Sequence, residues 1–179
     1  MRVVIVYESM FGNTRLIAEA IAEGLAPGNE VTVVPVAQAG RELLDGADLV
    51  VAGGPTHIHR MSGARSRAGA VEMAHKDGSQ LTLDPSAEGP GLRDWLAGLG
   101  QIHTRGAAFD TRLTGAPMLT GRASKTIAKL LERHGIAPLS PAESFLVTRD
   151  NQLRPGEQDR ARRWGRKLAA LLPTARPAG

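Results

Sequence analysis

The chain has 179 residues, of which 42% are hydrophobic and 22% charged, and this balance is ordinary for one globular domain. It contains no cysteine, which excludes disulfides, thiolate metal sites, iron–sulfur clusters and a cysteine nucleophile. The formal net charge of +4 is modest for this length and favours a solvated, arginine-rich surface over a nucleic-acid-binding one. We expect a single domain over residues 1–172 and a disordered tail over residues 173–179.

The chain shows no targeting or membrane segment. Met1 leads directly into an apolar run, without the basic segment and small-residue cleavage site of a signal peptide. No apolar run approaches the ~18 residues of a membrane span. We therefore expect a cytoplasmic protein that does not enter a membrane.

Five short apolar runs predict β-strands. The first is a continuous β-branched run, which is typical of a strand that is buried on both faces of a parallel sheet. The predicted strands span residues 2–7, 30–36, 48–53, 105–110 and 143–148.

Between these strands, apolar residues recur at spacings of three and four, as on one face of an amphipathic helix. Trp95 and Trp164 lie on such stripes and are expected in the core. Strands that alternate with helices predict an α/β fold with a parallel sheet. Residues 57–88 fit this pattern poorly, and a connection of this length is usually functional, mobile or both. The predicted helices span residues 14–25, 90–98, 123–134 and 156–172, with a short helix around 63–74.

A turn of small polar residues follows the first strand, with the sequence Ser9-Met10-Phe11-Gly12-Asn13-Thr14. The hydroxyls of Ser9 and Thr14, a tight turn at Gly12 and the free N–H groups of the next helix can together bind a phosphate monoester without Lys or Arg. The same residue types also occur in turns that only cap a helix. The dinucleotide pattern Gly-x-Gly-x-x-Gly and the P-loop pattern are both absent here, which favours a mononucleotide.

The segment from Tyr7 to Thr14, with the Ala-rich helix after it, resembles the FMN-phosphate loop of the flavodoxin family, especially of the flavodoxin domains of flavodiiron proteins. Gly53-Gly54-Pro55-Thr56 resembles the start of the second flavin loop of that family. The resemblance is strong over residues 1–60, weak over 100–172 and absent over 61–88. It implies a three-layer, doubly wound, five-stranded parallel sheet of order 2-1-3-4-5, with FMN at the carboxyl ends of the strands. The FMN-binding residues that it implies are Ser9, Met10, Phe11, Gly12, Asn13, Thr14, Pro55, Thr56, His57, Ile58, Asp110, Thr111 and Arg112.

The pocket expected for the flavin ring departs from the flavodoxin pattern because it lacks aromatic residues. Flavodoxins usually hold the ring between aromatic side chains, but the second loop (56–61) and the third loop (110–117) contain no Trp, Tyr or Phe. Loss of an aromatic stack costs on the order of 1 kcal/mol of affinity. The side chains that would then have to cover the ring are His57, Ile58, Leu113 or a residue from 61–75.

The charges near the expected ring also differ from those of typical flavodoxins, which surround the flavin with acidic residues. Positive charge at the ring would stabilise the negatively charged reduced flavin, raise the redox potential and favour two-electron chemistry. The arginines expected near the ring edge are Arg60, Arg65, Arg67 and Arg112.

Two further residues have open roles. His57 could donate a hydrogen bond to reduced flavin, or it could be a loop histidine without a redox task. It does not form a natural metal pair with His59, because residues two apart in an extended chain point to opposite sides. Asp110 could contact the flavin edge, cap a helix or pair with Arg112.

The leading hypothesis is an FMN-binding, flavodoxin-like redox protein that acts as an electron carrier or as a reductase of a small acceptor such as a quinone. The alternative is a non-redox regulatory or interaction module of the same fold with weak or lost FMN binding. A phosphatase or response-regulator relative is poorly supported, since Glu8 stands without a second acidic residue at the end of the first strand. Expected partners are FMN and either NAD(P)H or an acidic redox partner. A second copy of the chain could complete the ring pocket in a homodimer, and we expect neither nucleic acid nor a membrane as a partner.

Overall fold

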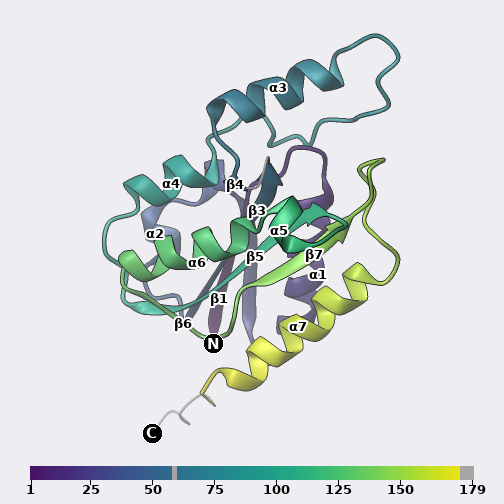
Figure 1. Ribbon diagram of the computed structural model, residues 1–179. Coiled ribbons are helices and arrows are strands. Elements are labelled where there is room, and N and C mark those ends of the chain that lie inside the picture. The colour runs from purple at the N-terminus through teal and green to yellow at the C-terminus, as the bar shows by residue number, and fades with distance from the viewer. Residues whose placement is uncertain (58–59, 174–179) are drawn as a thin grey trace, which may run out of the picture.

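The computed structural model describes residues 1–57 and 60–173. A parallel β-sheet forms its centre (Figure 1). The strand order is β2-β1-β3-β5-β6, β7 pairs in parallel with β5, and the short β4 runs antiparallel to the end of β3. The strands are β1 (Arg2–Tyr7), β2 (Glu30–Pro35), β3 (Leu49–His57), β4 (Arg60–Met61), β5 (Thr104–Leu113), β6 (Ile136–Pro138) and β7 (Glu143–Val147).

The fifth position of the sheet is shared by two strands. β6 pairs with the start of β5, from Thr104 to Gly106, and β7 pairs with its end, from Phe109 to Leu113. Pro138 ends β6 and Pro141 lies in the break before β7, and proline cannot donate a hydrogen bond to a strand ladder. The predicted order 2-1-3-4-5 is therefore confirmed, with the fifth strand interrupted.

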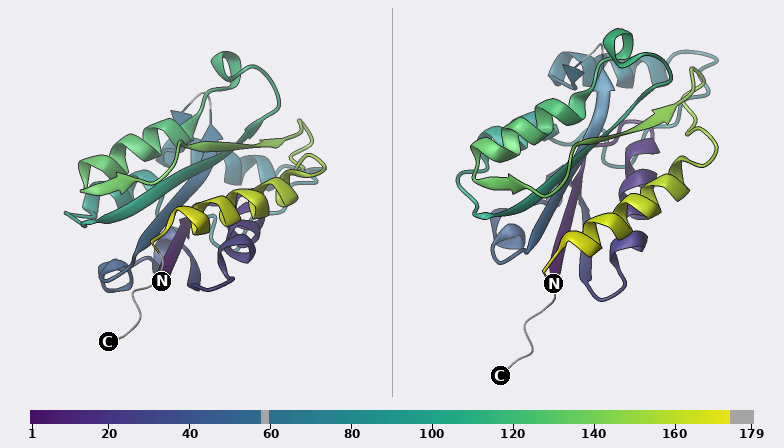
Figure 2. Two further views of the ribbon diagram at one scale, coloured as in Figure 1. Left: turned by 90° about the horizontal axis from the view of Figure 1, so that it is seen from below. Right: turned by 60° about the horizontal axis from the view of Figure 1, so that its bottom comes forward.

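Helices cover both faces of the sheet, so that the molecule has three layers (Figure 2). α1 (Asn13–Leu25) and α7 (Glu157–Leu171) pack on one face through a core that includes Trp164. Trp95, also expected in the core, packs on the other face and donates its indole N–H to the carbonyl of Ala39 at 2.8 Å. The elements on that face are η1 (Val36–Gln38), α2 (Arg41–Leu44), α4 (Leu92–Gly98) and α6 (Ala123–Arg133).

α1 and α7 approach each other closely because each has a glycine at the contact. A Cβ on Gly24 would lie 2.2 Å from the carbonyl oxygen of Arg162, and a Cβ on Gly165 would lie 2.3 Å from that of Ile21. Any larger residue would separate the helices. This packing fixes α1, and with it the turn at its N-terminus.

β3 and β5 extend past their predicted ends at residues 53 and 110, because their pairing continues through Gly54 with Asp110 and Pro55 with Thr111. The glycine at position 53 has a packing reason: a Cβ there would lie 2.2 Å from the ring of Phe109. Residues predicted in the second and third loops are therefore held on strand ends.

The segment between β4 and α4 lies outside the three layers, at the carboxyl end of the sheet (Figure 1). It contains α3 (Ala64–Ala74), close to the predicted helix around 63–74, followed by an irregular return. A small apolar cluster of Met10, Ala70 and Ala87 joins it to the turn after β1. The remaining helix, α5 (Pro117–Thr120), follows β5.

Among the described residues, no helix has the length and apolarity needed to cross a membrane. Within the predicted disordered tail, residues 174–179 lie outside the described part of the chain.

Candidate functional site

The turn between β1 and α1 has the geometry expected of an anion cradle, and we refer to residues 9–14 as the cradle. Ser9 and Thr14 are each only 1% exposed, and Gly12 has a φ of +87°, a conformation that favours glycine. The N–H of Gly12 donates to the Ser9 hydroxyl at 3.1 Å. No side chain caps the N-terminus of α1, and no acidic residue lies in its first turn. The turn is therefore not a simple capping turn, and its free helix N–H groups are available to an anion.

Strand ends from across the sheet close around this cradle. The Thr14 and Thr111 hydroxyls are hydrogen-bonded at 2.8 Å, which ties α1 to β5. The side-chain amide of Asn13 donates to the carbonyl oxygen and to the side-chain oxygen of Asn151, in the loop after β7, at 3.0 and 3.1 Å. The turn is thus held on two sides by residues that are distant in sequence.

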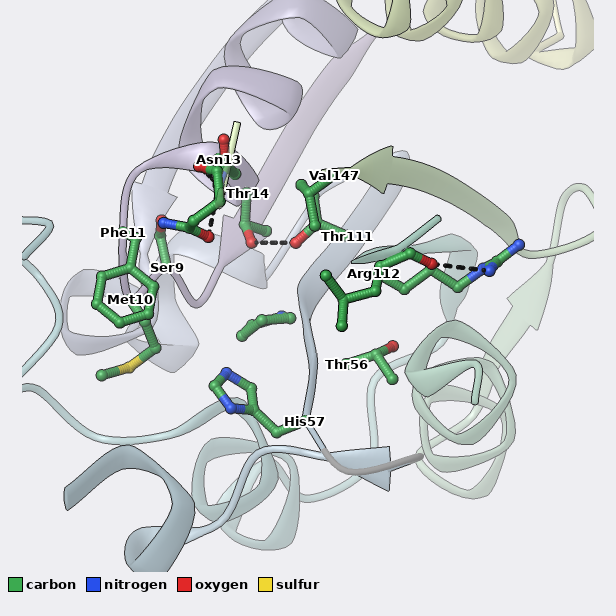
Figure 3. Close-up of a pocket in the computed structure, with 13 residues that line it drawn as sticks. Ser9, Met10, Phe11, Asn13, Thr14, Thr56, His57, Thr111, Arg112 and Val147 are labelled. Carbon is green, nitrogen blue, oxygen red and sulfur yellow. Dashed lines mark hydrogen bonds between the residues drawn. The ribbon is translucent and has the colours of Figure 1, made fainter. Parts of the chain in front are cut away.

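One cavity contains most of the predicted site (Figure 3). Side chains from the ends of β1, β3, β5 and β7 point toward a common space, with the cradle on one side and His57 on another (Figure 3). Of the predicted residues, Gly12 and Asp110 do not line it, and Ile58 lies outside the described residues. The lining residues are Ser9, Met10, Phe11, Asn13, Thr14, Pro55, Thr56, His57, Thr111, Arg112, Leu113, Val147 and Asn151.

Sequence reasoning did not include Val147 and Asn151 among the site residues. Both follow from the fold, because the carboxyl ends of parallel strands meet at one edge of the sheet. The only signal in the sequence is the Asp150-Asn151 pair, a typical turn, after the last strand. Asn151 has a positive φ of 57°, which asparagine tolerates better than most residues.

Asp110 has mainly a structural role in this arrangement. Its Oδ2 accepts hydrogen bonds from the N–H of Ser124 at 2.7 Å and from the Thr56 hydroxyl at 3.1 Å. The Thr56 hydroxyl in turn accepts the N–H of Ala123 at 2.9 Å. The two side chains therefore cap α6, and among the described residues the buried Oδ1 of Asp110 has no hydrogen-bond partner.

Arg112 organises the chain after β5. Its guanidinium donates to the carbonyls of Leu113 and Gly115 at 3.2 and 3.0 Å, and to the Thr120 hydroxyl at 2.8 Å. It is 8% exposed and has no carboxylate partner among the described residues. The guanidinium is therefore directed toward the chain after β5, while the residue itself contributes to the cavity lining (Figure 3). Arg67, also expected near the ring, instead pairs with Asp94 at 3.2 Å.

His57 lies at the edge of the cavity, and burial lowers the pKa of its imidazole. The negative charge of Glu8 opposes this shift but is the smaller effect. Glu8 is buried, accepts the N–H of Leu92 at 2.7 Å and is hydrogen-bonded by the Ser62 hydroxyl. This shift favours the neutral imidazole, which can donate one hydrogen bond and accept another.

Phe11 is the only aromatic residue that lines the cavity in the described part of the chain. It comes from the first loop, whereas the second and third loops contribute His57 and Leu113. Leu113 is 49% exposed, at the cavity edge. These three side chains are the available covers for a planar ring.

Comparison with known proteins identifies the sequence pattern of the first half of the chain. Residues 5–77, which contain the cradle and the second loop, match the flavodoxin family model. This match supports the resemblance of the N-terminal part of the chain to flavodoxins. Proteins of this family bind FMN, and this confirms the prediction of an FMN-binding, flavodoxin-like redox protein; the non-redox alternative is not favoured.

Solved structures of flavodoxins share the fold of this chain. It is similar to a flavodoxin from the domain Archaea, with a TM-score of 0.65, 20% identity and coverage of 96% of this chain and 99% of that one. The chain is also similar to flavodoxin 1 from Bacillus cereus, with a TM-score of 0.64 and 17% identity, over 97% of this chain and 100% of that one. Its similarity to rubredoxin oxygen:oxidoreductase from Desulfovibrio gigas has a TM-score of 0.60 and 18% identity. The alignment covers 96% of this chain but only 36% of that one. Comparison with curated protein sequences gives no match.

Proposed function

We propose that this chain holds FMN in the cavity at the carboxyl ends of β1, β3, β5 and β7, with the phosphate in the cradle of residues 9–14. The observation that carries the proposal is the uncapped N-terminus of α1, which opens into that cavity beside the buried hydroxyls of Ser9 and Thr14. The helix dipole and free N–H groups stabilise a phosphate dianion there. The residues present therefore fit the cofactor.

Bound FMN would supply the electron chemistry, and the side chains would position it and set its potential. Thr111 supports the cradle through Thr14, while His57, Phe11 and Leu113 surround the remaining space. The guanidinium of Arg112, without a carboxylate partner, favours extra negative charge on the flavin. We therefore propose a redox potential above that of flavodoxins with acidic flavin sites, which a redox titration of the FMN-loaded protein measures.

The test of FMN binding compares two flavins that differ only in the phosphate. Quenching of flavin fluorescence should show binding of FMN at micromolar concentration or tighter, and much weaker binding of riboflavin. Equal affinity for the two flavins would remove the role assigned to the cradle. Absence of FMN binding would contradict the proposal as a whole.

The donor, the assembly and the location stay predictions. We propose NAD(P)H or an acidic redox protein as the electron donor, and oxidation of NADPH in air by the FMN-loaded protein tests the first of these. Sedimentation in the presence and absence of FMN tests the proposed homodimer. The proposed cytoplasmic location is tested by fractionation of the cells that make the protein.

A further inference from the structure

An open groove lies between α3 and the turn after β1, directly beside the FMN cavity. Apolar side chains of Phe11, Met61, Ala70 and Met73 form most of its walls. Phe11 and His57 line both the groove and the cavity. A molecule in the groove would therefore lie next to a molecule in the cavity, with Phe11 and His57 in reach of both.

Two arginines at the groove carry uncompensated positive charge. Arg65 on α3 and Arg93 on α4 are both exposed and both line the groove. Arg93 donates only to the carbonyls of Met61 and Ser62, at 3.3 and 3.4 Å. In the described ranges, neither guanidinium has a carboxylate within 4.0 Å, whereas the neighbouring Arg67 is paired with Asp94.

Gly69, in the middle of α3, leaves room in the groove. A Cβ at this position would have no heavy atom within 4 Å. Glycine is unfavourable inside a helix relative to residues with side chains. The backbone of α3 does not require a glycine here, so a larger side chain would fill the groove without disturbing the fold.

We propose that this groove binds the small-molecule electron acceptor of the protein, and that this acceptor is a planar aromatic molecule with an anionic substituent. The proposal rests on the proposed FMN site, because only FMN makes the adjacent cavity a redox centre. An aromatic ring matches the phenyl and thioether groups of Phe11, Met61 and Met73. An anionic group would form ion pairs with Arg65 and Arg93. A neutral ring would leave both guanidinium groups without an ionic partner.

The experiment measures binding of anthraquinone-2-sulfonate to the FMN-loaded protein by titration calorimetry, with neutral 2-(hydroxymethyl)anthraquinone as the comparison ligand. We expect one sulfonate per chain. Gly69→Leu should weaken this binding at least tenfold by filling the groove. Gly98→Leu is the matched control: Gly98 also lies in a helix, also has open space at its Cβ and lines neither space, so affinity should not change.

The charge is tested separately from the shape. The double variant Arg65→Gln/Arg93→Gln should weaken binding of the sulfonate about two- to tenfold at low salt and by a smaller factor at high salt. Its affinity for the neutral analogue should not change. Arg163→Gln, an exposed arginine on α7, controls for the overall charge. An equal effect on both ligands would overturn the part played by the arginines.

The FMN affinity of every variant is measured in parallel, which separates the two proposals. If the wild-type chain does not bind FMN, the proposed function fails. If FMN binds but the sulfonate does not, or binds equally well to Gly69→Leu, only the groove proposal fails. If Gly69→Leu weakens the binding of FMN itself, the groove holds the flavin ring. If NADPH displaces the sulfonate, the groove is the site of the electron donor. Either result overturns the proposal that the groove binds the acceptor.

Discussion

The two ends of the candidate FMN site are built in different ways. At the phosphate end, the turn of residues 9–14 is buried, has the flavodoxin pattern and is hydrogen-bonded to Thr111 and Asn151. The ring end consists of His57 and the chain from Thr111 to Gly121. These positions do not have the aromatic and acidic residues that surround the ring in typical flavodoxins. That end is organised instead by one arginine, Arg112, and lies beside the groove beneath α3.

This difference separates affinity from redox behaviour. In the proposed FMN site, the phosphate end would contribute binding energy that is the same in every redox state of the flavin. The ring end would set the potential and determine which molecules approach, because it would contact the part of FMN whose charge changes. A chain can therefore keep a flavodoxin anchor and still differ from flavodoxins in potential and acceptor.

The largest expected effect tests the phosphate end. Ser9→Ala combined with Thr14→Ala removes two hydroxyls that face the proposed phosphate. Hydrogen bonds to charged groups contribute about 1.5–3 kcal/mol each, so the dissociation constant of FMN should rise roughly 10²- to 10⁴-fold. Riboflavin binding should change less than about twofold, since riboflavin has no phosphate. A comparable loss for both flavins would mean that the variant has only disturbed the fold, which thermal unfolding would also reveal.

The second effect concerns the connection that joins the phosphate end to the segment after α3. Asp84 is buried, accepts the N–H and hydroxyl of Ser86 at 3.0 and 2.7 Å, and pairs with Arg15 at 2.9 Å. Burial opposes ionisation, but these three interactions outweigh it and lower the pKa of Asp84. Asp84→Asn should therefore reduce the free energy of unfolding by about 1–2 kcal/mol, discounted because Arg15 is 37% exposed.

Urea unfolding at pH 7 measures this loss, and Asp45→Asn is the control. Asp45 forms an exposed pair with Arg41 at 3.3 Å, so its replacement should cost less than about 0.5 kcal/mol. Because the folded pKa of Asp84 lies below its unfolded value, its stabilising effect is present above the unfolded pKa. It should disappear as the pH falls through the lower, folded pKa. Equal losses in the two variants would show that the connection contributes no more than a surface pair.

The same contrast explains how much could be predicted from sequence. The cradle of residues 9–14 is local, so its residue types, the glycine and the following helix all appear within one short segment. The roles of Asp110 and Thr56 depend instead on Ala123 and Ser124, which only the folded sheet brings beside them. Capping of α6 by these two side chains therefore could not be read from their own segments.

The fold was predicted where periodicity had enough residues to be visible. Long strands and helices were placed within a few residues of their observed ends. The two-residue β4, the three-residue β6 and the four-residue α2 and α5 are too short to show a period. β3 and β5 are longer than predicted because Gly54 pairs with Asp110 beyond the predicted strand ends. This pairing joins segments that are distant in sequence, so local strand propensity does not predict it.

The third effect tests the ring end. Arg112→Met keeps an apolar stem but removes the hydrogen bonds to Leu113, Gly115 and Thr120. If the loosened chain after β5 costs flavin binding the net contribution of about one hydrogen bond, roughly 0.5–1.5 kcal/mol, FMN and riboflavin should both bind up to about tenfold more weakly, by the same factor. The redox potential of bound FMN should also fall, since a cation has been removed. A loss for FMN alone would place Arg112 at the phosphate.

Arg122→Met is the matched control for this variant. Arg122 also has a structural role, donating to the Ser144 hydroxyl at 3.2 Å and the Ala142 carbonyl at 3.1 Å, but it does not line the cavity. Its replacement should lower stability without changing the affinity for either flavin. Flavin titration and urea unfolding of both variants separate an effect on the ring end from a general loss of structure.

The smallest effect is the pH dependence contributed by His57. Burial lowers its folded pKa, so the unfolded chain takes up a proton near the ordinary value of about 6.5, while the folded chain does so only at lower pH. Within that window the unfolded state binds more protons, and the free energy of unfolding therefore decreases as the pH falls. A single group contributes no more than ~1.4 kcal/mol per pH unit. The negative charge of Glu8 opposes the shift, and the charged side chains of Arg65 and Arg93 line the same groove as His57. In urea unfolding between pH 7 and pH 5, the free energy of unfolding should change less with pH for His57→Asn than for the wild type. Identical slopes in the two proteins would mean that burial does not lower the pKa of His57, and that the boundary between cavity and groove is open to solvent.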